Sequence, residues 1–305
     1  MQLIGTAKAV LFQSDSQPLG GAKVLRRKHR MAGVLGLMAF LCSFAAAQTP
    51  TAGSQKPGGR PASLQNAPTD HHQDTSGQPV AVQNVPAEQH VNDWSYLLEK
   101  YRSANRQLPP PAPGERRVVF MGDSITENWG AKDRELGEFF PGRPFLNRGV
   151  SGETSPQMLV RFRQDVIDLK ARVVVILAGS NDIAGNTGPM ELADTEANLQ
   201  SMSDLAVANG IRVVLCSVLP ARAFPWQPGI DPSAKIAELN RWIRQYAQSR
   251  GFPYVDYYDA VVDTDGGMKP ELSPDGVHPN AKGYAVMAPL AQAGIEAALA
   301  KPLHR

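Results

Sequence analysis

The sequence is poor in cysteine, in net charge and in long apolar runs, and each shortage excludes a class of protein. Cys42 and Cys216 are the only 2 cysteines among 305 residues. They are too few for a disulfide framework and lack the spacing of zinc ligands. The formal net charge is +2, and charged residues make up 20% of the chain. This balance favours neither nucleic acid nor an anionic membrane surface as a partner. We therefore expect no metal site and no nucleic-acid partner.

An apolar run near the N-terminus is shorter than a membrane span. It extends from Val34 to Ala47, follows the basic residues 26–30 and ends in three alanines. A bilayer core requires about 20 apolar residues, whereas a basic flank, a short apolar segment and small terminal residues are typical of a secretory signal peptide. We interpret residues 1–47 as an N-terminal extension and signal peptide cleaved near Ala47, so that the protein is exported to the periplasm or the exterior. Without cleavage, the same segment would be a membrane anchor.

Residues 48–92 are rich in Pro, Gly, Gln and Ser and contain few large apolar residues. Such a composition cannot bury enough apolar surface to offset the entropy lost on ordering, so we predict a disordered linker. His71 and His72 lie within it, and we interpret them as solvated side chains. The remaining residues, 93–305, are predicted to form one domain with an N-terminal helix. Trp94 to Tyr101 has helical spacing, with Asn92 or Asp93 as a cap.

Beyond residue 117, short β-branched runs alternate with amphipathic segments. Strands are predicted at residues 118–121, 145–147, 173–177, 213–215 and 254–255. Helices are predicted at residues 158–169, 192–208, 236–247 and 281–299. Regular alternation of strand and helix favours a parallel sheet with helices on both faces. The predicted fold is therefore a three-layer α/β/α sandwich with a mostly parallel central sheet.

Four short polar motifs occur in order along this domain. They are Gly122–Ser124, Ser151–Thr154, Gly179–Asp182 and Asp275–His278. The first follows a predicted strand directly, the second and third come shortly after predicted strands, and the fourth lies in a long loop before the last helix. Loops at the carboxyl ends of parallel strands converge on one edge of the sheet. The motifs would bring together a hydroxyl group, an imidazole with a carboxylate, and amide donors, which are the parts that a serine esterase needs.

These motifs resemble the four blocks of the SGNH hydrolases, also called the GDSL esterase/lipase family, which carry Ser, Gly, Asn and His in this order. The resemblance covers roughly residues 117–297 and implies the flavodoxin-like SGNH fold. It implies ester hydrolysis without a cofactor. The sequence departs from the family pattern at Ile125-Thr126, where the name-giving motif has leucine, and has Ser180 at a variable position. Neither departure touches a reacting group, so both leave the catalytic residues in place and weaken what the resemblance implies about the substrate.

The chemistry gives each candidate catalytic residue a role. Ser124 is the candidate nucleophile, His278 the general base, and Asp275 the group that orients the imidazole. The amide of Gly152, the side-chain amide of Asn181 and the amide of Ser124 are the candidate oxyanion donors. Taken singly, each has a structural alternative. Asp123 and Ser124 could only cap a helix, His278 could be a loop histidine, and Asn181 could belong to an ordinary turn.

Three aromatic residues are candidates for substrate binding. Phe224 and Trp226 lie in the segment 219–232, which is rich in proline and aromatic residues and follows a predicted strand. Such a loop could form a binding lip or a plain surface connection. Trp129, close behind the candidate nucleophile, could line the pocket or pack beneath it.

We therefore predict an exported serine esterase that hydrolyses short-chain esters, most simply acetyl groups on carbohydrate, through an acyl-enzyme and without a cofactor. The resemblance also allows a lysophospholipase, a lipid esterase like the platelet-activating-factor acetylhydrolases, or a sugar O-acyltransferase. A carbohydrate-binding module without activity is a further alternative, although it would have no reason to keep both Ser124 and His278. Acyl-chain length, the alcohol released and the oligomeric state stay open.

Overall fold

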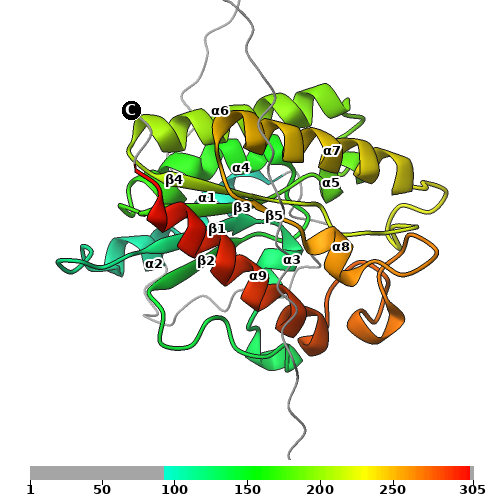
Figure 1. Ribbon diagram of the computed structural model, residues 1–305, viewed down its shortest axis with the longest axis horizontal. Helices are drawn as coiled ribbons and strands as arrows, with labels where there is room; N and C mark the ends of the chain where they lie inside the picture. The colour runs from blue at the N-terminus through cyan, green and yellow to red at the C-terminus, as the bar shows by residue number, and fades with distance from the viewer. Residues whose placement is uncertain (1–92, 303–305) are drawn as a thin grey trace, which may run out of the picture. The chain divides into compact units, whose positions relative to one another are not determined.

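The structure, a computed structural model, describes residues 93–302 (Figure 1). The predicted signal peptide at residues 1–47 and the predicted linker at residues 48–92 lie outside the described residues. Within residues 93–302, no helix is both long and apolar enough to cross a membrane.

The described part of the chain is built on a five-stranded sheet with the order β2-β1-β3-β4-β5, in which every neighbouring pair is parallel. The strands are β1 (Val118–Gly122), β2 (Phe145–Gly149), β3 (Val173–Leu177), β4 (Arg212–Cys216) and β5 (Tyr254–Val255). The chain runs from β1 to β2 on one side and then returns to β3 on the other side of β1. Ligands bind at such a reversal, beyond the carboxyl ends of the strands.

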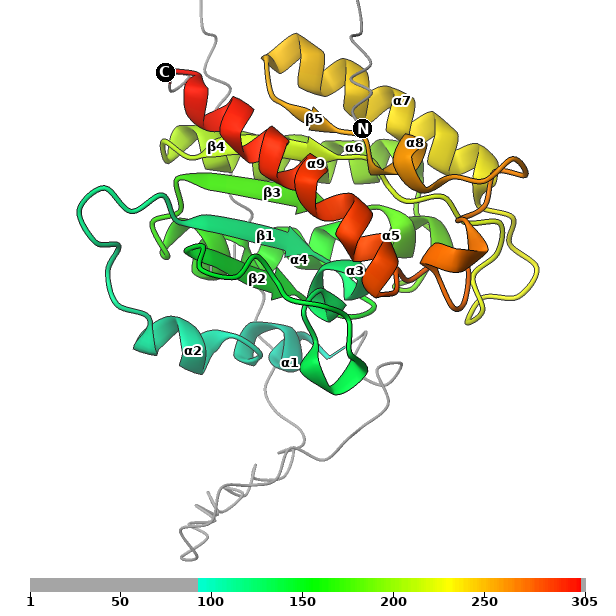
Figure 2. The same cartoon turned by 60° about the horizontal axis from the view of Figure 1, so that its bottom comes forward.

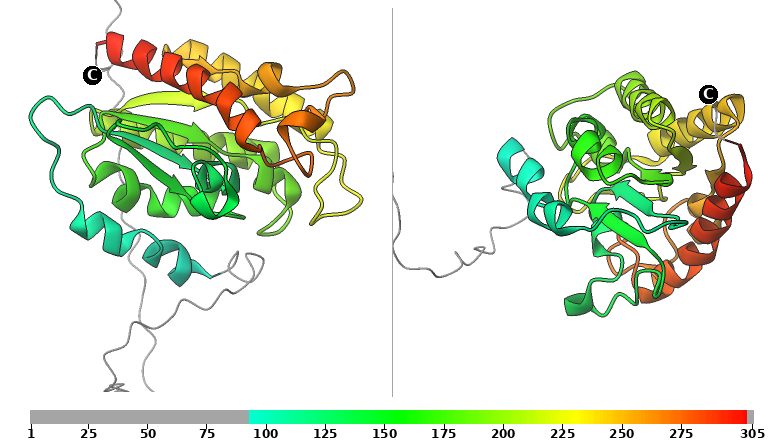
Figure 3. Two further views of the ribbon diagram at one scale, coloured as in Figure 1. Left: turned by 90° about the horizontal axis from the view of Figure 1, so that it is seen from below. Right: turned by 90° about the vertical axis from the view of Figure 1, so that its left-hand side faces the viewer.

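Helices cover both faces of this sheet, as Figures 2 and 3 show, and the predicted α/β/α fold class is confirmed. Successive side chains of a strand point to opposite faces. Val119 and Met121 of β1 accordingly belong to one apolar core, and Val118 and Phe120 to the other. The first core includes α4 (Ser155–Phe162), α6 (Leu192–Ala208) and α7 (Ser233–Arg250). The second includes α3 (Ser124–Asn128), α8 (Tyr257–Val261) and α9 (Ala281–Ala300). Cys216 is buried at the end of β4 in the second core.

Several helices begin or end away from their predicted bounds, for local reasons. α4 begins at Ser155, three residues earlier than predicted, because Thr154 and Gln157 form a capping box. Residues Arg163–Ile167 then continue it as a π-helical turn, η3. The sequence also missed α5 (Ser180–Ala184), a helix of one turn that begins after Gly179, whose φ is 126°.

The predicted N-terminal helix is two short helices, α1 (Trp94–Glu99) and α2 (Arg102–Gln107). Asp93 caps α1 by accepting hydrogen bonds from the amides of Ser95 and Tyr96. Leu97 is the buried apolar residue of α1. The hydrogen bonds and the ion pair of these helices lead toward the candidate active site. Two short 3-10 helices, η2 (Lys132–Arg134) and η4 (Pro270–Leu272), complete the set of elements.

Candidate active site

Ser124, His278 and Asp275 form a continuous hydrogen-bonded chain. Oγ of Ser124 lies 2.9 Å from Nε2 of His278, although 154 positions separate the two residues. Nδ1 of His278 lies 2.7 Å from Oδ2 of Asp275. Because a carboxylate only accepts hydrogen bonds, Nδ1 carries the proton and Nε2 is left to accept the hydroxyl hydrogen. The structure therefore brings together the three residues in the relation that a general base, its nucleophile and its orienting carboxylate require.

Ser124 is the first residue of α3, and only Asp123 separates it from the end of β1. Gly122 makes this turn possible, because a Cβ there would lie 2.1 Å from Oγ1 of Thr126 and 2.9 Å from the carbonyl oxygen of Leu177. Asp123 caps α3 through a 2.9 Å hydrogen bond from the amide of Ile125 to its Oδ1. The capping role considered for Asp123 is therefore present, while the hydroxyl of Ser124 faces His278. Burial raises the pKa of Asp123 to about 6.

The loop that carries His278 is ordered by its own residues. Oδ1 of Asp275 accepts hydrogen bonds from the amides of Val277 at 2.9 Å and His278 at 2.8 Å. The hydroxyl of Ser273 donates to the same oxygen and accepts from the amide of Gly276. Partial burial opposes ionisation of Asp275, but the hydrogen bonds from His278 and Val277 outweigh it and hold its pKa well below the ordinary value. Asp275 is thus a carboxylate at neutral pH and can stabilise an imidazolium.

The two remaining motifs meet at the turn of residues 122–124, which carries Ser124 and which we call the nucleophile turn. Gly152 has a φ of 78°, in the left-handed region that favours glycine. Asn181, in the first turn of α5, is buried, and its Nδ2 donates to the carbonyl oxygen of Glu153 at 2.9 Å. The same nitrogen lies 3.5 Å from Oδ2 of Asp123, at the limit of a hydrogen bond. One hydrogen of Asn181 is therefore only weakly engaged and can turn to a substrate oxygen.

Asp182, the last residue of the third motif, makes contacts well beyond its own turn. Its carboxylate accepts hydrogen bonds from the amide and hydroxyl of Ser155 at the start of α4. It also accepts a 3.1 Å bond from the hydroxyl of Thr195 in α6. Burial raises the pKa of Asp182. Its contacts are structural and connect three helices beneath the site.

Behind Gly152 lies a buried ionic cluster that the sequence analysis missed. We call it the Arg161 cluster, and it consists of Arg161, Glu153 and Asp165, with the arginine and both carboxylates fully enclosed. Nε of Arg161 donates to Glu153 at 2.6 Å, and Nη1 donates to Asp165 at 2.9 Å. Nη2 reaches the carbonyl oxygens of Arg148 at 2.8 Å and Gly122 at 3.3 Å. One guanidinium group thus joins β1, β2, α4 and the segment that follows Gly152.

The charges in this cluster support one another. Burial alone would lower the pKa of Arg161, but the charges and hydrogen bonds of Glu153 and Asp165 outweigh it and raise the pKa. Arg161 therefore stays protonated. The signals available in the sequence were the position of Glu153 directly after Gly152 and the four-residue spacing of Arg161 and Asp165 on a predicted helix.

The N-terminal helices are tied to the same region from two sides. Asn105 of α2 donates to Asp165 at 2.6 Å and accepts bonds of 3.0 and 2.8 Å from Arg148. Lys100, at the end of α1, forms an ion pair with Glu127 of α3. Glu127 in turn accepts a 2.5 Å bond from the amide of Ser151, the neighbour of Gly152. The first series of contacts runs through Asp165 and Arg161 to Glu153, and the second runs through Glu127 to Ser151. Glu153 and Ser151 are the two neighbours of Gly152 in the chain.

The three aromatic candidates differ in position. Trp129 is 4% exposed and stacks on Tyr284 with ring centroids 5.1 Å apart. Phe224 is 1% exposed and stacks beneath Trp226, also with centroids 5.1 Å apart. Trp129 and Phe224 are therefore packed in the apolar cores of the domain, and a role for either in substrate binding stays a prediction. The ring of Trp226 is half-buried, and its centroid lies 5.9 Å from that of His278.

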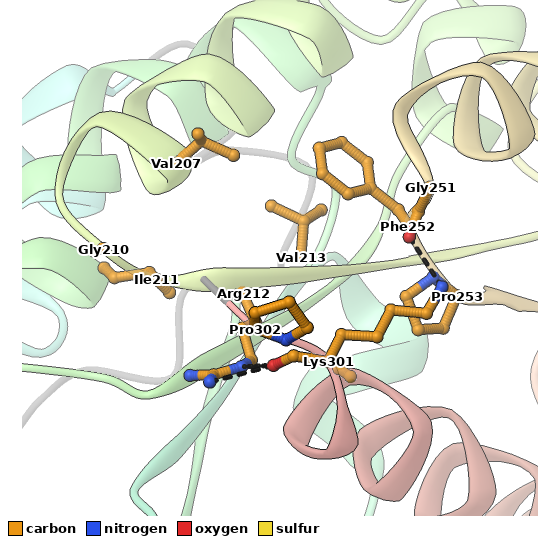
Figure 4. A pocket seen from close by; sticks show the side chains of 11 residues that line it. Val207, Gly210, Ile211, Arg212, Val213, Gly251, Phe252, Pro253, Lys301 and Pro302 are labelled. Carbon is orange, nitrogen blue, oxygen red and sulfur yellow. Dashed lines mark hydrogen bonds between the residues drawn. The ribbon is translucent and has the colours of Figure 1, made fainter. Parts of the chain in front are cut away.

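A separate pocket lies away from this site. It is lined by Val207, Arg212, Phe252, Lys301 and their neighbours at the amino end of β4 (Figure 4). The guanidinium group of Arg212 donates two 3.1 Å bonds to the carbonyl oxygen of Lys301 there. The four motifs follow the carboxyl ends of the strands or join their loops, so no candidate catalytic residue lines it. Within residues 93–302, no group of histidine, cysteine and acidic side chains is arranged to hold a metal ion.

Comparison with known proteins places these observations in a family. The model of the GDSL-like lipase/acylhydrolase family matches residues 120–286, which include all four motifs. The crystal structure of a GDSL-like lipase from Bacteroides thetaiotaomicron is 42% identical, with a TM-score of 0.63. That match covers 67% of this chain and 98% of the other.

Two further relatives are esterases. An acetylxylan esterase from Xylanibacter ruminicola is 26% identical over 232 residues, which are 66% of this chain and 47% of that protein. The chain thus spans less than half the length of that relative. Esterase TesA from Pseudomonas aeruginosa is 28% identical over 177 residues, which are 53% of this chain and 79% of that protein.

Proposed function

Because the chain belongs to the GDSL-like lipase/acylhydrolase family of ester hydrolases, we propose that it is a serine esterase acting through Ser124, His278 and Asp275. The hydrogen-bonded chain from the hydroxyl through the imidazole to the carboxylate carries this proposal, with separations of 2.9 and 2.7 Å. Oγ of Ser124 attacks the ester carbonyl, and His278 takes its proton. His278 then donates that proton to the leaving alkoxide, which departs as the alcohol.

The acyl-enzyme is resolved by the reverse use of the same groups. His278 takes a proton from water, the resulting hydroxide adds to the acyl carbonyl, and Ser124 regains the proton as the acid departs. Asp275 stays ionised and stabilises the imidazolium in both steps. The amides of Gly152 and Ser124 and the side chain of Asn181 bind the negative charge that develops on the carbonyl oxygen. A single donor of this kind contributes roughly 10²- to 10³-fold to turnover.

For the substrate, we propose a short-chain ester on carbohydrate, with acetyl as the acyl group. The half-buried ring of Trp226 beside His278 offers an apolar face of the kind that binds ligands next to a catalytic group. The similarity to an acetylxylan esterase over 66% of this chain supports the same choice. Export after removal of residues 1–47 would place the enzyme where polysaccharide is found.

The experiment measures hydrolysis of 4-nitrophenyl acetate and of acetylated xylan by the purified protein and by Ser124→Ala. We expect turnover of both substrates to fall by roughly 10⁴-fold or more in the variant. Ser249→Ala, in which an exposed hydroxyl of α7 is removed, is the matched control and should retain full activity. Equal rates in Ser124→Ala and the wild type would overturn the serine mechanism.

The substrate class is decided by two additions to this assay. Release of fatty acid from lysophospholipid without release of acetate from xylan would replace the carbohydrate by a lipid. Acetylation of an added sugar acceptor at the expense of hydrolysis would make the protein an acyltransferase. Each result leaves the acyl-enzyme at Ser124 in place.

A further inference from the structure

Asn186 lies two residues beyond the end of α5, and its side-chain amide has partners in three separate segments. Nδ2 donates to the carbonyl oxygen of Gly152 at 3.0 Å and to Oδ1 of Asn181 at 2.9 Å. Oδ1 accepts a 3.0 Å bond from Nε1 of Trp226. One amide group therefore contacts two of the three residues that carry candidate oxyanion donors, and also the aromatic ring beside His278.

The chemistry of these partners fixes the orientation of the Asn186 amide. An indole N–H only donates, so Oδ1 must face Trp226. A backbone carbonyl only accepts, so Nδ2 must face Gly152. Flipping the amide would place oxygen against oxygen on one side and N–H against N–H on the other. Both hydrogens of Nδ2 are used, and the second reaches Oδ1 of Asn181.

Asn186 in turn fixes the orientation of Asn181. Because Oδ1 of Asn181 is held by Asn186, Nδ2 of Asn181 is directed to Glu153 and toward the nucleophile turn. The opposite orientation would turn a carbonyl oxygen toward the developing oxyanion, which would repel it. The same Asn186 amide holds the peptide group that follows Gly152, next to the second donor.

We propose that Asn186 is a positioning residue that sets the oxyanion hole and connects it to Trp226. The inference rests on the proposed function, in which Gly152 and Asn181 bind the oxyanion. A hydrogen bond from the Trp226 indole restrains Asn186, and Asn186 restrains the two donors. A ligand that packs against the Trp226 ring therefore acts on the group that orients Asn181, so that binding of the sugar and stabilisation of the oxyanion are connected by one side chain.

The first test uses Asn186→Asp and Asn186→Ala with 4-nitrophenyl acetate, a substrate without a sugar. The aspartate keeps an acceptor for Trp226 but faces Asn181 and Gly152 with oxygen, and we expect kcat to fall roughly 30-fold. The alanine removes all three bonds, and we expect a fall of about 10-fold. KM should change less than about threefold, because the residue acts on the transition state. Asn209→Ala, which removes an exposed asparagine at the end of α6, is the matched control and should leave kcat unchanged.

A double variant separates positioning from general structural damage. In an Asn181→Ala background the donor that Asn186 orients is absent, so adding Asn186→Ala should lower kcat by no more than about threefold further. The pH midpoint of kcat/KM should stay that of the wild type, because the contact between His278 and Asp275 is untouched. Full multiplication of the two single effects, or a shifted midpoint, would overturn the proposal.

A readout without turnover keeps this proposal distinct from the proposed function. The Nε1 hydrogen of Trp226 should exchange with solvent slowly in the wild type and roughly 10-fold or more faster in Asn186→Ala, followed by NMR of indole-labelled protein. Trp226→Phe keeps a ring beside His278 but no N–H, and should lower kcat about threefold. Unchanged indole exchange together with wild-type kcat in Asn186→Ala would refute the inference. Loss of the Ser124 dependence would instead refute the serine mechanism.

Discussion

The two sides of the candidate active site are built in different ways. The side proposed to move the proton comes from one short loop, residues 273–278, in which Asp275 orders its own neighbours. The side proposed to bind the oxyanion depends on side chains from distant elements, joined through Asn186 and the Arg161 cluster. The comparison shows that one half of a candidate site can be set locally while the other half depends on the packing of the whole domain.

Solvent exposure separates the two sides as well. The side chains of His278 and Asp275 are 25% and 36% exposed, whereas those of Arg161 and Glu153 are fully enclosed. Water screens charges at the first side, so their pairing contributes little to folding. At the second side, removal of one charge leaves the other buried and unpaired, which is costly. Substitutions at the first side should therefore affect catalysis, and those at the second should affect stability first.

The largest effect is expected from His278→Ala, which tests whether the proton-transfer side is independent of the fold. We expect turnover of 4-nitrophenyl acetate to fall roughly 10⁴-fold or more, because Ser124 loses its base. The free energy of unfolding, from urea denaturation, should stay within about 0.5 kcal/mol of the wild type. A loss of stability comparable to that of an Arg161 variant would break the proposed division between the two sides.

The next largest effect is expected from Arg161→Met, which fills a similar volume without the charge. Glu153 and Asp165 would lose their buried partner, and the free energy of unfolding should fall by about 3–5 kcal/mol. Arg244→Met is the matched control, since Arg244 is 56% exposed and pairs with Asp256 at the surface. It should cost less than about 1 kcal/mol. Equal costs in the two variants would show that burial does not distinguish them.

Asp123 interacts with residues of both sides, Asn181 and His278. The pH dependence of stability tests whether its carboxyl group is as buried as the groups of the second side. Burial raises its pKa to about 6, so from about pH 4 to pH 6 the folded protein keeps a proton that the unfolded chain releases. The stability of the wild type therefore falls through this group as the pH rises in that window. Asp123→Asn has no such proton but can still accept from Ile125. We expect its free energy of unfolding, minus that of the wild type, to rise by about 2–3 kcal/mol between pH 4 and pH 7.

Urea denaturation of both proteins over this pH range measures the difference between their free energies of unfolding. The contributions of all other titrating groups are the same in both proteins and cancel in this difference. A constant difference would mean that the pKa of Asp123 is the same in the folded and the unfolded protein.

The smallest effect is expected from Asn105→Ala in α2, which lies outside the matched residues 120–286. The change removes a bond to Asp165 and two from Arg148. We expect a loss of about 2 kcal/mol in urea denaturation, because bonds to charged groups contribute about 1.5–3 kcal/mol. Gln107→Ala, at an exposed position of the same helix, should cost less than about 0.5 kcal/mol. If the two variants are equally stable, the N-terminal helices do not support the Arg161 cluster.

The sequence predicted what depends on local pattern. The runs 173–177 and 254–255 are strands with the predicted bounds. The first is fully buried and rich in β-branched residues, which leaves an unambiguous signal. β2 continues two residues past its predicted end, because Gly149 pairs with Gly122 in the sheet. α5 was missed because a single turn has no periodicity, and its first residues are turn formers.

The site was predictable to the extent that its chemistry is carried by motifs. The order of Ser124, Gly152, Asn181 and His278 is visible in the sequence, but their supports are not. Asn186 belongs to no recognisable pattern, and its partners lie up to 40 positions away. The position of Trp129 was ambiguous because it depends on stacking with Tyr284 of the last helix. Such contacts are fixed by the packing of the domain.

The buried thiol of Cys216 can report how often the folded domain opens. Burial raises its pKa to about 12, and a thiol reacts with alkylating reagents only as the thiolate. After removal of residues 1–47, which contain Cys42, it would be the single sulfhydryl of the chain. Labelling would then wait until β4 separates from its neighbours, so with a reagent that reacts faster than the protein recloses, the labelling rate would equal the rate of opening.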